Sequence, residues 1–232
     1  MGKSWKNGLK TENSQKKGLV FTKLAREISV ATKAGGADSA MNARLRMAID
    51  AAKKQSCPND TIERAIKKGS GQLDDGAQIE EVIYEGYGPH GVGVIVECQT
   101  DNRHRTAPEV RNTFKKHDGS MGESGSVAWM FERVGLIEAK KSGSFDPEEE
   151  AIEAGANEVE KSDEGYSFYT SIESLDEVRH NLQKRGWTVQ SFEPSFKAKN
   201  TTELSSEQKT DIEEFLVALD DMDDSHRVYA TI

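Results

Sequence analysis

The residues best suited to chemistry in this sequence are the lysines and arginines of its first third. Residues 1–72 hold fifteen basic residues against six acidic ones, a net charge of +9, and residues 73–232 hold sixteen against thirty-four, a net charge of −18. Clustered cations bind phosphate groups by displacing condensed counterions. The uneven charge therefore predicts a nucleic-acid-binding part joined to an acidic part, and it also predicts attraction between the two.

The cations of this first third fall outside the apolar stripes of three expected helices. Arg64, Lys67 and Lys68 have i, i+3, i+4 spacing, which places them on one helical face. We expect nucleic-acid contacts from Lys3, Lys6, Lys10, Lys16, Lys17, Lys23, Arg26, Lys33, Arg44, Arg46, Lys53, Lys54, Arg64, Lys67 and Lys68. The alternative interpretation of the same cations is a solvated helical surface that binds nothing.

Recognition of a particular base sequence has less support than recognition of phosphates or shape. A DNA-reading helix presents Arg, Asn or Gln to base edges from its first turn. Asn42 and Asn59 lie near helix starts, where a simple N-cap explains each of them at least as well. Phosphate or shape recognition is favoured, and structured RNA is a natural target for it.

A second candidate site, for an anion or a partner, is expected from Arg103 and Arg105, between an expected strand and an expected helix, and from Arg111 on the outer face of that helix. Arginines beside the free amides of a helix N-terminus can hold a phosphate or a carboxylate. The alternative is a capped turn, in which Asp101 or Asn102 accepts hydrogen bonds from nearby amides and an aspartate pairs with an arginine. Both interpretations stay open at this point.

Enzymatic chemistry has little support in the sequence. It has no nucleophile motif, no paired-carboxylate spacing and no His-rich metal pattern, and a lone histidine such as His104 in a polar loop is usually exposed. The glycine-rich turn at 86–91 lacks phosphate-loop spacing and is expected to join a hairpin. We predict no catalytic, cofactor-binding or metal-binding residues, and we expect the acidic run at 220–224 to be a solvated helix end.

Hydrophobic periodicity predicts the elements that must position these residues. A period of 3.6 predicts a three-helix domain from helices at 21–35, 42–54 and 58–68, with Gly69 just past the last as its C′ glycine. The period then changes to 2 and predicts strands at 82–84 and 92–96, a helix at 106–116 and a buried strand at 127–131.

The second half predicts a complete ferredoxin-like unit. Its elements follow the order β-α-β-β-α-β, with strands at 136–139, 158–161, 166–170 and 188–192 and helices at 147–155 and 174–185. A capping box at Ser205 and Gln208 opens a last helix, and a strand at 227–231 follows. Because the ferredoxin-like unit needs no further strand, this terminal pair is expected to join the sheet that precedes it.

The expected fold class is α+β and multidomain: an N-terminal three-helix domain plus two α+β, ferredoxin-like domains, one inserted in the other. The expected boundaries are 1–20 for a mobile basic arm, 21–76 for the basic helical domain, 77–133 with 201–232 for a discontinuous α+β domain and 134–200 for the inserted domain. Cys57 and Cys98 are expected to be reduced thiols, which suits the cytosol.

Several sequence blocks resemble the YebC/PmpR family. They include RLRMAI at 44–49, PNDTIERAIKKG at 58–69, YEGYGP at 84–89 and GSVA with MF between 125 and 131. The blocks keep the family's order and span most of residues 1–133. The resemblance implies three domains and a cytoplasmic protein of bacteria or mitochondria. It implies either a probable DNA-binding transcriptional regulator or, as for the mitochondrial translational activator of cytochrome oxidase, action on the ribosome.

The N-terminal arm departs from the family pattern. The stretch KTEN at 10–13 stands where members commonly carry a run such as Lys-His-Arg-Lys, so this arm is less basic. The sequence and the resemblance together predict a cytoplasmic, non-enzymatic regulator of gene expression without a membrane segment or cofactor. Its expected partners are DNA or rRNA, with the ribosome or the transcription machinery. The alternative is an adaptor whose basic helical face docks an acidic protein, and the oligomeric state is left open.

Overall fold

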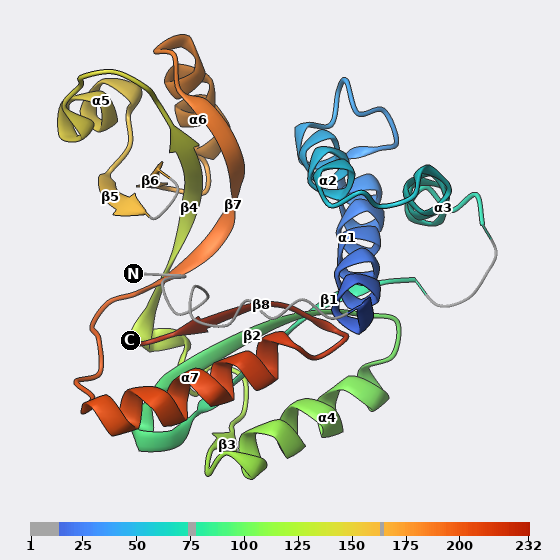
Figure 1. The fold of residues 1–232 in the computed structure, drawn as a ribbon, viewed down its shortest axis with the longest axis vertical. Coiled ribbons are helices and arrows are strands. Elements are labelled where there is room, and N and C mark those ends of the chain that lie inside the picture. The colour runs from blue at the N-terminus through green and yellow to red at the C-terminus, as the bar shows by residue number, and fades with distance from the viewer. Residues whose placement is uncertain (1–13, 74–77, 163–164) are drawn as a thin grey trace. The chain divides into compact units, whose positions relative to one another are not determined.

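The computed structural model describes residues 14–73, 78–162 and 165–232. The described chain divides into two compact units, residues 131–197 in one and residues 14–130 with 198–232 in the other. Its elements are seven α-helices and two four-stranded sheets (Figure 1). The expected α+β multidomain class is therefore confirmed.

Three helices form the basic part of the larger unit: α1 (Ser14–Gly35), α2 (Ala43–Lys54) and α3 (Asn59–Gly69). Their buried side chains include Ile28 of α1, Leu45 of α2 and Ile62 of α3. Asn42 is the N-cap of α2, because its side chain accepts a hydrogen bond from the Leu45 amide at 3.0 Å. Its amide group also donates to the Ala31 carbonyl of α1 at 2.8 Å, so the cap joins the two helices.

Two details of this region differ from the expectation. Residues 14–20, expected in the basic arm, are the first turns of α1. Gly69 is the last residue of α3 rather than its C′ glycine, and Gly71 has the positive φ of 73°. Gly69 serves close packing instead, since a Cβ there would lie 2.3 Å from the Ser29 carbonyl oxygen of α1. Asn59, the first residue of α3, follows an N-cap at Pro58 that makes no side-chain cap bond.

The sheet of the larger unit has the strand order β3-β1-β2-β8. Its elements are β1 (Glu80–Tyr87), β2 (Gly93–Thr100), α4 (Arg103–Lys116), β3 (Ser120–Met121), α7 (Ser206–Asp220) and β8 (Ser225–Ala230). The hairpin of β1 and β2 closes through the 3₁₀ turn η2 (Pro89–Gly91), as expected for the glycine-rich turn. The chain's last strand pairs antiparallel with β2, where Val228 faces Val96.

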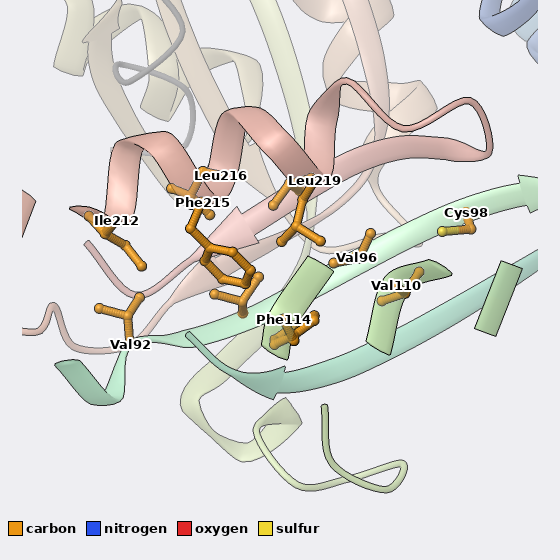
Figure 2. Packing of buried hydrophobic residues seen from close by; sticks show 11 residues of the cluster. Val92, Val96, Cys98, Val110, Phe114, Ile212, Phe215, Leu216 and Leu219 are labelled. Carbon is orange, nitrogen blue, oxygen red and sulfur yellow. The ribbon is translucent and has the colours of Figure 1, made fainter. Parts of the chain in front are cut away.

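Both helices of this sheet contribute to one apolar core (Figure 2). Phe114 of α4 and Phe215 of α7 meet edge to face at 5.0 Å between ring centroids, in one cluster with Val92, which precedes β2, and Val94 and Val96 of β2. The expected capping box of α7 is confirmed by reciprocal bonds between Ser205 and Gln208. The core fixes α4 on the sheet and thereby positions the polar residues of its first turn.

The buried strand expected at 127–131 is wrong. Residues 128–130 form the 3₁₀ turn η3 (Ala128–Met130), and a strand begins only at Phe131. The cause is the buried carboxylate of Glu85, which accepts hydrogen bonds from the amides of Gly125, Val127 and Ala128. These bonds wrap the backbone around one side chain, so its amides cannot join a strand ladder.

The smaller unit has the expected β-α-β-β-α-β order. Its elements are β4 (Phe131–Lys140), α5 (Pro147–Ala154), β5 (Glu158–Ser162), β6 (Gly165–Thr170), α6 (Leu175–Lys184) and β7 (Thr188–Ala198). The strand order β5-β6-β4-β7 is the ferredoxin-like arrangement. Trp187 packs on Phe168 in the core and donates through Nε1 to Glu150, whose pKa falls to about 2 because Arg185 and Trp187 both hydrogen-bond to it.

Candidate nucleic-acid interface

One group of cations in the helical region lies at the ends of α2 and α3. Lys53 and Lys54 occupy the last turn of α2, and Lys67 and Lys68 the last turn of α3. All are exposed except Lys68, which is half-buried. No ion pair holds any of these four among the described residues. Cations in a last helical turn also interact favourably with the helix dipole, so lysines at these positions do not lower the stability of the helices.

The face of α3 is fixed by its packing on α1. Ile62 and Ala65 point into the helical core, which turns Arg64 and Lys67 outward. The Ser29 hydroxyl of α1 donates to the Ala65 carbonyl at 2.9 Å and locks the two helices together. Arg64 and Lys67 line an open hollow of about 380 Å³, whose other lining residues are Asp60, Glu63 and Leu73. The result is a rigid, hollowed surface of mixed charge with cations at its C-terminal end.

Two cations of α1, Lys23 and Arg26, differ from this group because they contact the acidic C-terminal run. Lys23 donates to the Asp220 carbonyl, and Arg26 donates to the Asp223 carbonyl. Arg26 also forms an ion pair with the Asp224 carboxylate at 2.9 Å. These two predicted nucleic-acid contacts thus join the helical region to the end of α7 and to the turn before β8.

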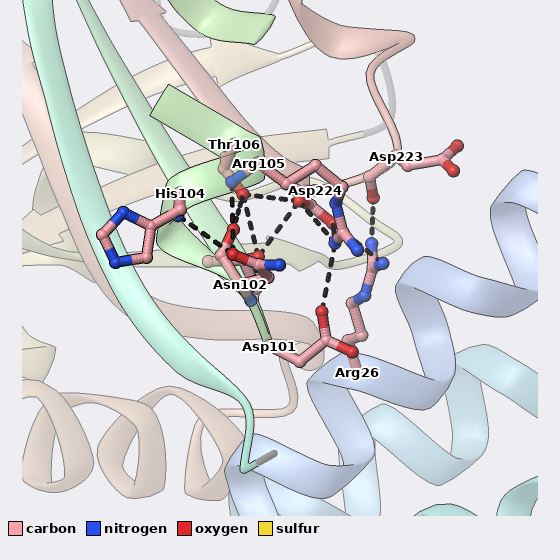
Figure 3. Close-up of polar contacts among 9 residues, drawn as sticks. Arg26, Asp101, Asn102, His104, Arg105, Thr106, Asp223 and Asp224 are labelled. Atoms are coloured by element: carbon pink, nitrogen blue, oxygen red, sulfur yellow. Dashed lines mark hydrogen bonds and ion pairs between the residues drawn. The ribbon is translucent and has the colours of Figure 1, made fainter. Parts of the chain in front are cut away.

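Asp224 is the centre of this polar cluster (Figure 3). Its side chain is 0% exposed, and it accepts hydrogen bonds from Thr106 at 2.6 Å, Thr100 at 3.0 Å and Arg105 at 2.9 Å. Burial alone would raise the pKa of Asp224, but the hydroxyls and the two guanidinium groups hold that pKa below its ordinary value. The carboxylate therefore stays charged and joins α1, β2 and α4.

Arg44 of α2 is also held within the chain. Its guanidinium binds Glu27 at 2.8 Å and Glu81 at 3.1 Å. Glu27 further accepts a bond from Gln99 at 2.8 Å and lies 3.3 Å from the His226 ring. Burial would raise the pKa of Glu27, yet Arg44 keeps it below its ordinary value, and Glu27 in turn raises the pKa of Arg44. Arg44 thus contributes to the contact between the helices and the sheet.

The second candidate site has the geometry of the capped turn. The Asn102 side chain accepts bonds from the amides of His104 and Arg105, which satisfies the start of α4. Arg105 pairs with Asp101 at 3.1 Å and with Asp224, and Arg103 pairs with Glu80 at 2.6 Å. Arg103 and Arg105, two of the three predicted arginines, are therefore already paired with carboxylates of the chain. Arg111 is exposed on the outer face of α4.

The remaining predicted cations divide by position. Lys33 and Arg46 are exposed, and Arg46 donates to the carbonyl oxygens of Ser39 and Ala40. Lys3, Lys6 and Lys10 lie outside the described residues, and Lys16 and Lys17 belong to α1. Across residues 14–73, 78–162 and 165–232, no group of three or more His, Cys, Asp or Glu side chains is arranged to hold a metal ion.

The sequence analysis did not identify three carboxylates with structural roles: the buried Glu85 and Asp224 and the half-buried Glu27. The expectation of a solvated acidic end is wrong for Asp224, because its side chain faces Thr100 and Thr106 rather than water. A local pattern could have indicated this, since a Thr and an Asn-capped Arg-Thr pair around a helix start supply donors for one acceptor. Nothing local indicates which distant carboxylate fills that role.

Comparison with known proteins places this arrangement in a family. The TACO1/YebC N-terminal domain matches residues 3–72, and the TACO1/YebC second and third domain matches residues 79–232. The probable transcriptional regulatory protein Bd1964 of Bdellovibrio bacteriovorus is 72% identical over 232 residues, covering 100% of both chains. The probable transcriptional regulatory protein GSU1074 of Geobacter sulfurreducens is 47% identical, covering 93% of this chain and 87% of its own.

A solved structure has the same fold. The conserved hypothetical protein Aq1575 of Aquifex aeolicus is 44% identical, with a TM-score of 0.85, and the match covers 97% of this chain and 93% of that chain. No helix among the described residues is long and apolar enough to cross a membrane.

Proposed function

Because the chain belongs to the TACO1/YebC family, whose curated relatives are named probable transcriptional regulatory proteins, we propose that it is a non-enzymatic, nucleic-acid-binding regulator of gene expression. The observation that carries this proposal is the group of cations in the last turns of α2 and α3: the exposed Lys53, Lys54 and Lys67 and the half-buried Lys68. Their ammonium groups are available to phosphates, whereas carboxylates hold Arg26 and Arg44.

These lysines bind the phosphate backbone rather than the bases. Lysine is a point charge on a flexible stem, so it contacts phosphates without selecting a base sequence. Asn42 is occupied as a helix cap and cannot read base edges. The target is therefore DNA or rRNA recognised through its backbone and shape, and the protein acts in the cytoplasm with the transcription machinery or the ribosome. The acidic remainder, with its −18 charge, repels polyanions and restricts binding to the helical region.

Replacement of Lys67 and Lys68 together by Ala tests this function. Affinity for unrelated duplexes should fall uniformly, and the slope of log K against log salt concentration should decrease by about 1.8 for duplex DNA, since each phosphate contact contributes about 0.9. The matched control replaces Lys115 and Lys116, an adjacent exposed pair in the last turn of α4. That control removes the same charge from the same kind of helix end and should change the slope less.

Equal slopes for both double variants and the wild type would refute the assignment of α3. Crosslinking in cells, followed by sequencing of the bound nucleic acid, then separates the targets. Recovered rRNA indicates translation, and recovered promoter fragments indicate transcription. Recovery of neither, together with loss of an acidic protein partner in the Lys67 and Lys68 variant, would support the adaptor function instead.

A further inference from the structure

The loop between β3 and η3 is built around a buried acid. The Glu85 carboxylate accepts bonds from the amides of Gly125 at 2.8 Å, Val127 at 3.0 Å and Ala128 at 2.8 Å. Hydrogen bonds to a buried charged acceptor are stronger than ordinary amide bonds. Three of them on one side chain fix the backbone just before Trp129.

Trp129 follows this loop in η3, and its large aromatic side chain is 65% exposed. Its indole Nε1 donates to the Ser126 carbonyl oxygen at 3.1 Å. The Tyr87 hydroxyl donates to the same oxygen at 3.2 Å, and Tyr87 is itself 38% exposed. Two exposed aromatic rings, one from η3 and one from the end of β1, are therefore anchored to a single atom.

These two anchors determine what the rings can still bind. The polar edge of each ring is used inside the chain, so a ligand meets mainly the flat apolar faces. The rings are also held before binding, which reduces the conformational entropy that a partner must overcome. Flat, pre-positioned aromatic faces suit a flat aromatic ligand that stacks on them.

A cation lies beside the platform. The ammonium group of Lys199, which is exposed, donates to the Trp129 carbonyl at 3.0 Å. One hydrogen bond leaves two donors of the ammonium group for other acceptors. An aromatic face next to a positive charge is the combination that binds single-stranded nucleic acid, since bases stack while phosphates meet the cation.

We propose that Trp129 and Tyr87 form a stacking platform for unpaired nucleobases of a single strand, with Lys199 beside the phosphate. The platform rests on the proposed nucleic-acid function and adds a substrate feature to it. The cations of α2 and α3 hold the backbone of any nucleic acid, whereas the platform favours strands whose bases are free to stack.

The experiment measures binding of a labelled single-stranded RNA of about twelve nucleotides, and of the same strand annealed to its complement. Trp129→Ala should weaken single-strand binding roughly ten-fold, because stacking on one aromatic ring contributes about 1–3 kcal/mol per base. Duplex binding should change by less than about two-fold. Trp129→Phe keeps a stacking face but loses the bond to Ser126, so it should retain most of the affinity.

The Phe variant separates stacking from a structural role, since loss of the Ser126 bond would affect both variants equally. Ile152→Ala removes another exposed apolar side chain, 75% exposed on α5, and should leave binding unchanged. Equal single-strand affinity for wild type and Trp129→Ala overturns the platform, and so does equal loss in the Ala and Phe variants. If Trp129→Ala has no effect while the Lys67 and Lys68 variant loses binding, the proposed function stands without the platform. If the wild type binds neither probe, both fail.

Discussion

Two cations of α1, Lys23 and Arg26, and the lysines at the ends of α2 and α3 belong to one basic region, yet they have different partners. Arg26 reaches a buried carboxylate and a backbone carbonyl of the acidic C-terminal run. Lys53 and Lys67 are exposed at helix ends. The difference teaches that net charge locates a basic region, whereas only the partners of each cation separate those that stabilise the fold from those left to bind a ligand.

The distinction follows from where acidic groups are buried. A carboxylate that is buried or partly buried needs charged or hydrogen-bonding partners, and the arginines nearest to it in the fold supply them. Arg26 forms such an ion pair with Asp224, and Arg44 forms one with Glu27. The comparison makes a double prediction: loss of a paired group should reduce stability, and loss of an exposed cation should reduce binding.

The largest effect is expected from Asp224→Ala. It leaves Arg26 and Arg105 without their shared carboxylate and removes an acceptor of the Thr100 and Thr106 hydroxyls, which should lower the free energy of unfolding by about 3–5 kcal/mol. Urea unfolding followed by circular dichroism measures the loss. Asp223→Ala is the matched control, because only its backbone carbonyl contacts Arg26 and its side chain is exposed. Equal stability of the two variants would contradict the role of Asp224.

A smaller loss of stability is expected from Arg44→Ala. Glu27 would keep its bond from Gln99 but lose the guanidinium, and loss of a hydrogen bond to a charged group costs about 1.5–3 kcal/mol. Arg46→Ala, two residues further along α2, removes an exposed arginine that donates only to carbonyl oxygens. The same urea titration should place this control within about 0.5 kcal/mol of the wild type. A greater loss in the control would break the distinction between paired and exposed cations.

Acid should weaken the paired region. The folded-state pKa of Asp224 lies below its ordinary value of 3.8, and that of Glu27 below 4.5, so the unfolded chain takes up protons first as the pH falls. Their contribution to stability is complete above about pH 5 and is lost progressively as the pH falls through 4.5 and 3.8 toward the folded-state values. Thermal unfolding from pH 7 to pH 3 measures this loss. Asp224→Asn should show a shallower decline, and an identical decline in both proteins would exclude Asp224 as a contributor.

The smallest effect on stability is expected from joint replacement of Lys53 and Lys54 by Ala. Both are exposed in the last turn of α2, so only a favourable dipole interaction disappears, less than about 1 kcal/mol. Nucleic-acid affinity should nevertheless fall several-fold at low salt, which a fluorescence titration detects. A large loss of stability with unchanged binding would show that Lys53 and Lys54 stabilise the fold instead of binding nucleic acid.

Much of the fold could be predicted because periodicity is a local property. The three helices, the β-α-β-β-α-β order and the Ser205 capping box all follow from residues within a few positions of each other. Local pattern could not show that residues 127–131 would not form the expected strand. Their apolar side chains suit a strand or a 3₁₀ turn, and Glu85, about forty residues earlier in the chain, selects the turn by accepting bonds from the Val127 and Ala128 amides. Gly69 was misplaced for a similar reason, because its constraint comes from the Ser29 carbonyl of another helix.

The candidate site was predictable as a region but not residue by residue. Fifteen basic residues in residues 1–72 mark that region in any conformation, since charge is a sum over the sequence. The sequence by itself thus determined the fold class, the family and the basic part of the chain. The tertiary structure alone decided that Arg26, Arg44 and Arg105 are bound to Asp224 and Glu27, whereas Lys53 and Lys67 face solvent. The reason is physical: an ion pair depends on burial and on distances of a few ångströms between residues that are far apart in the sequence.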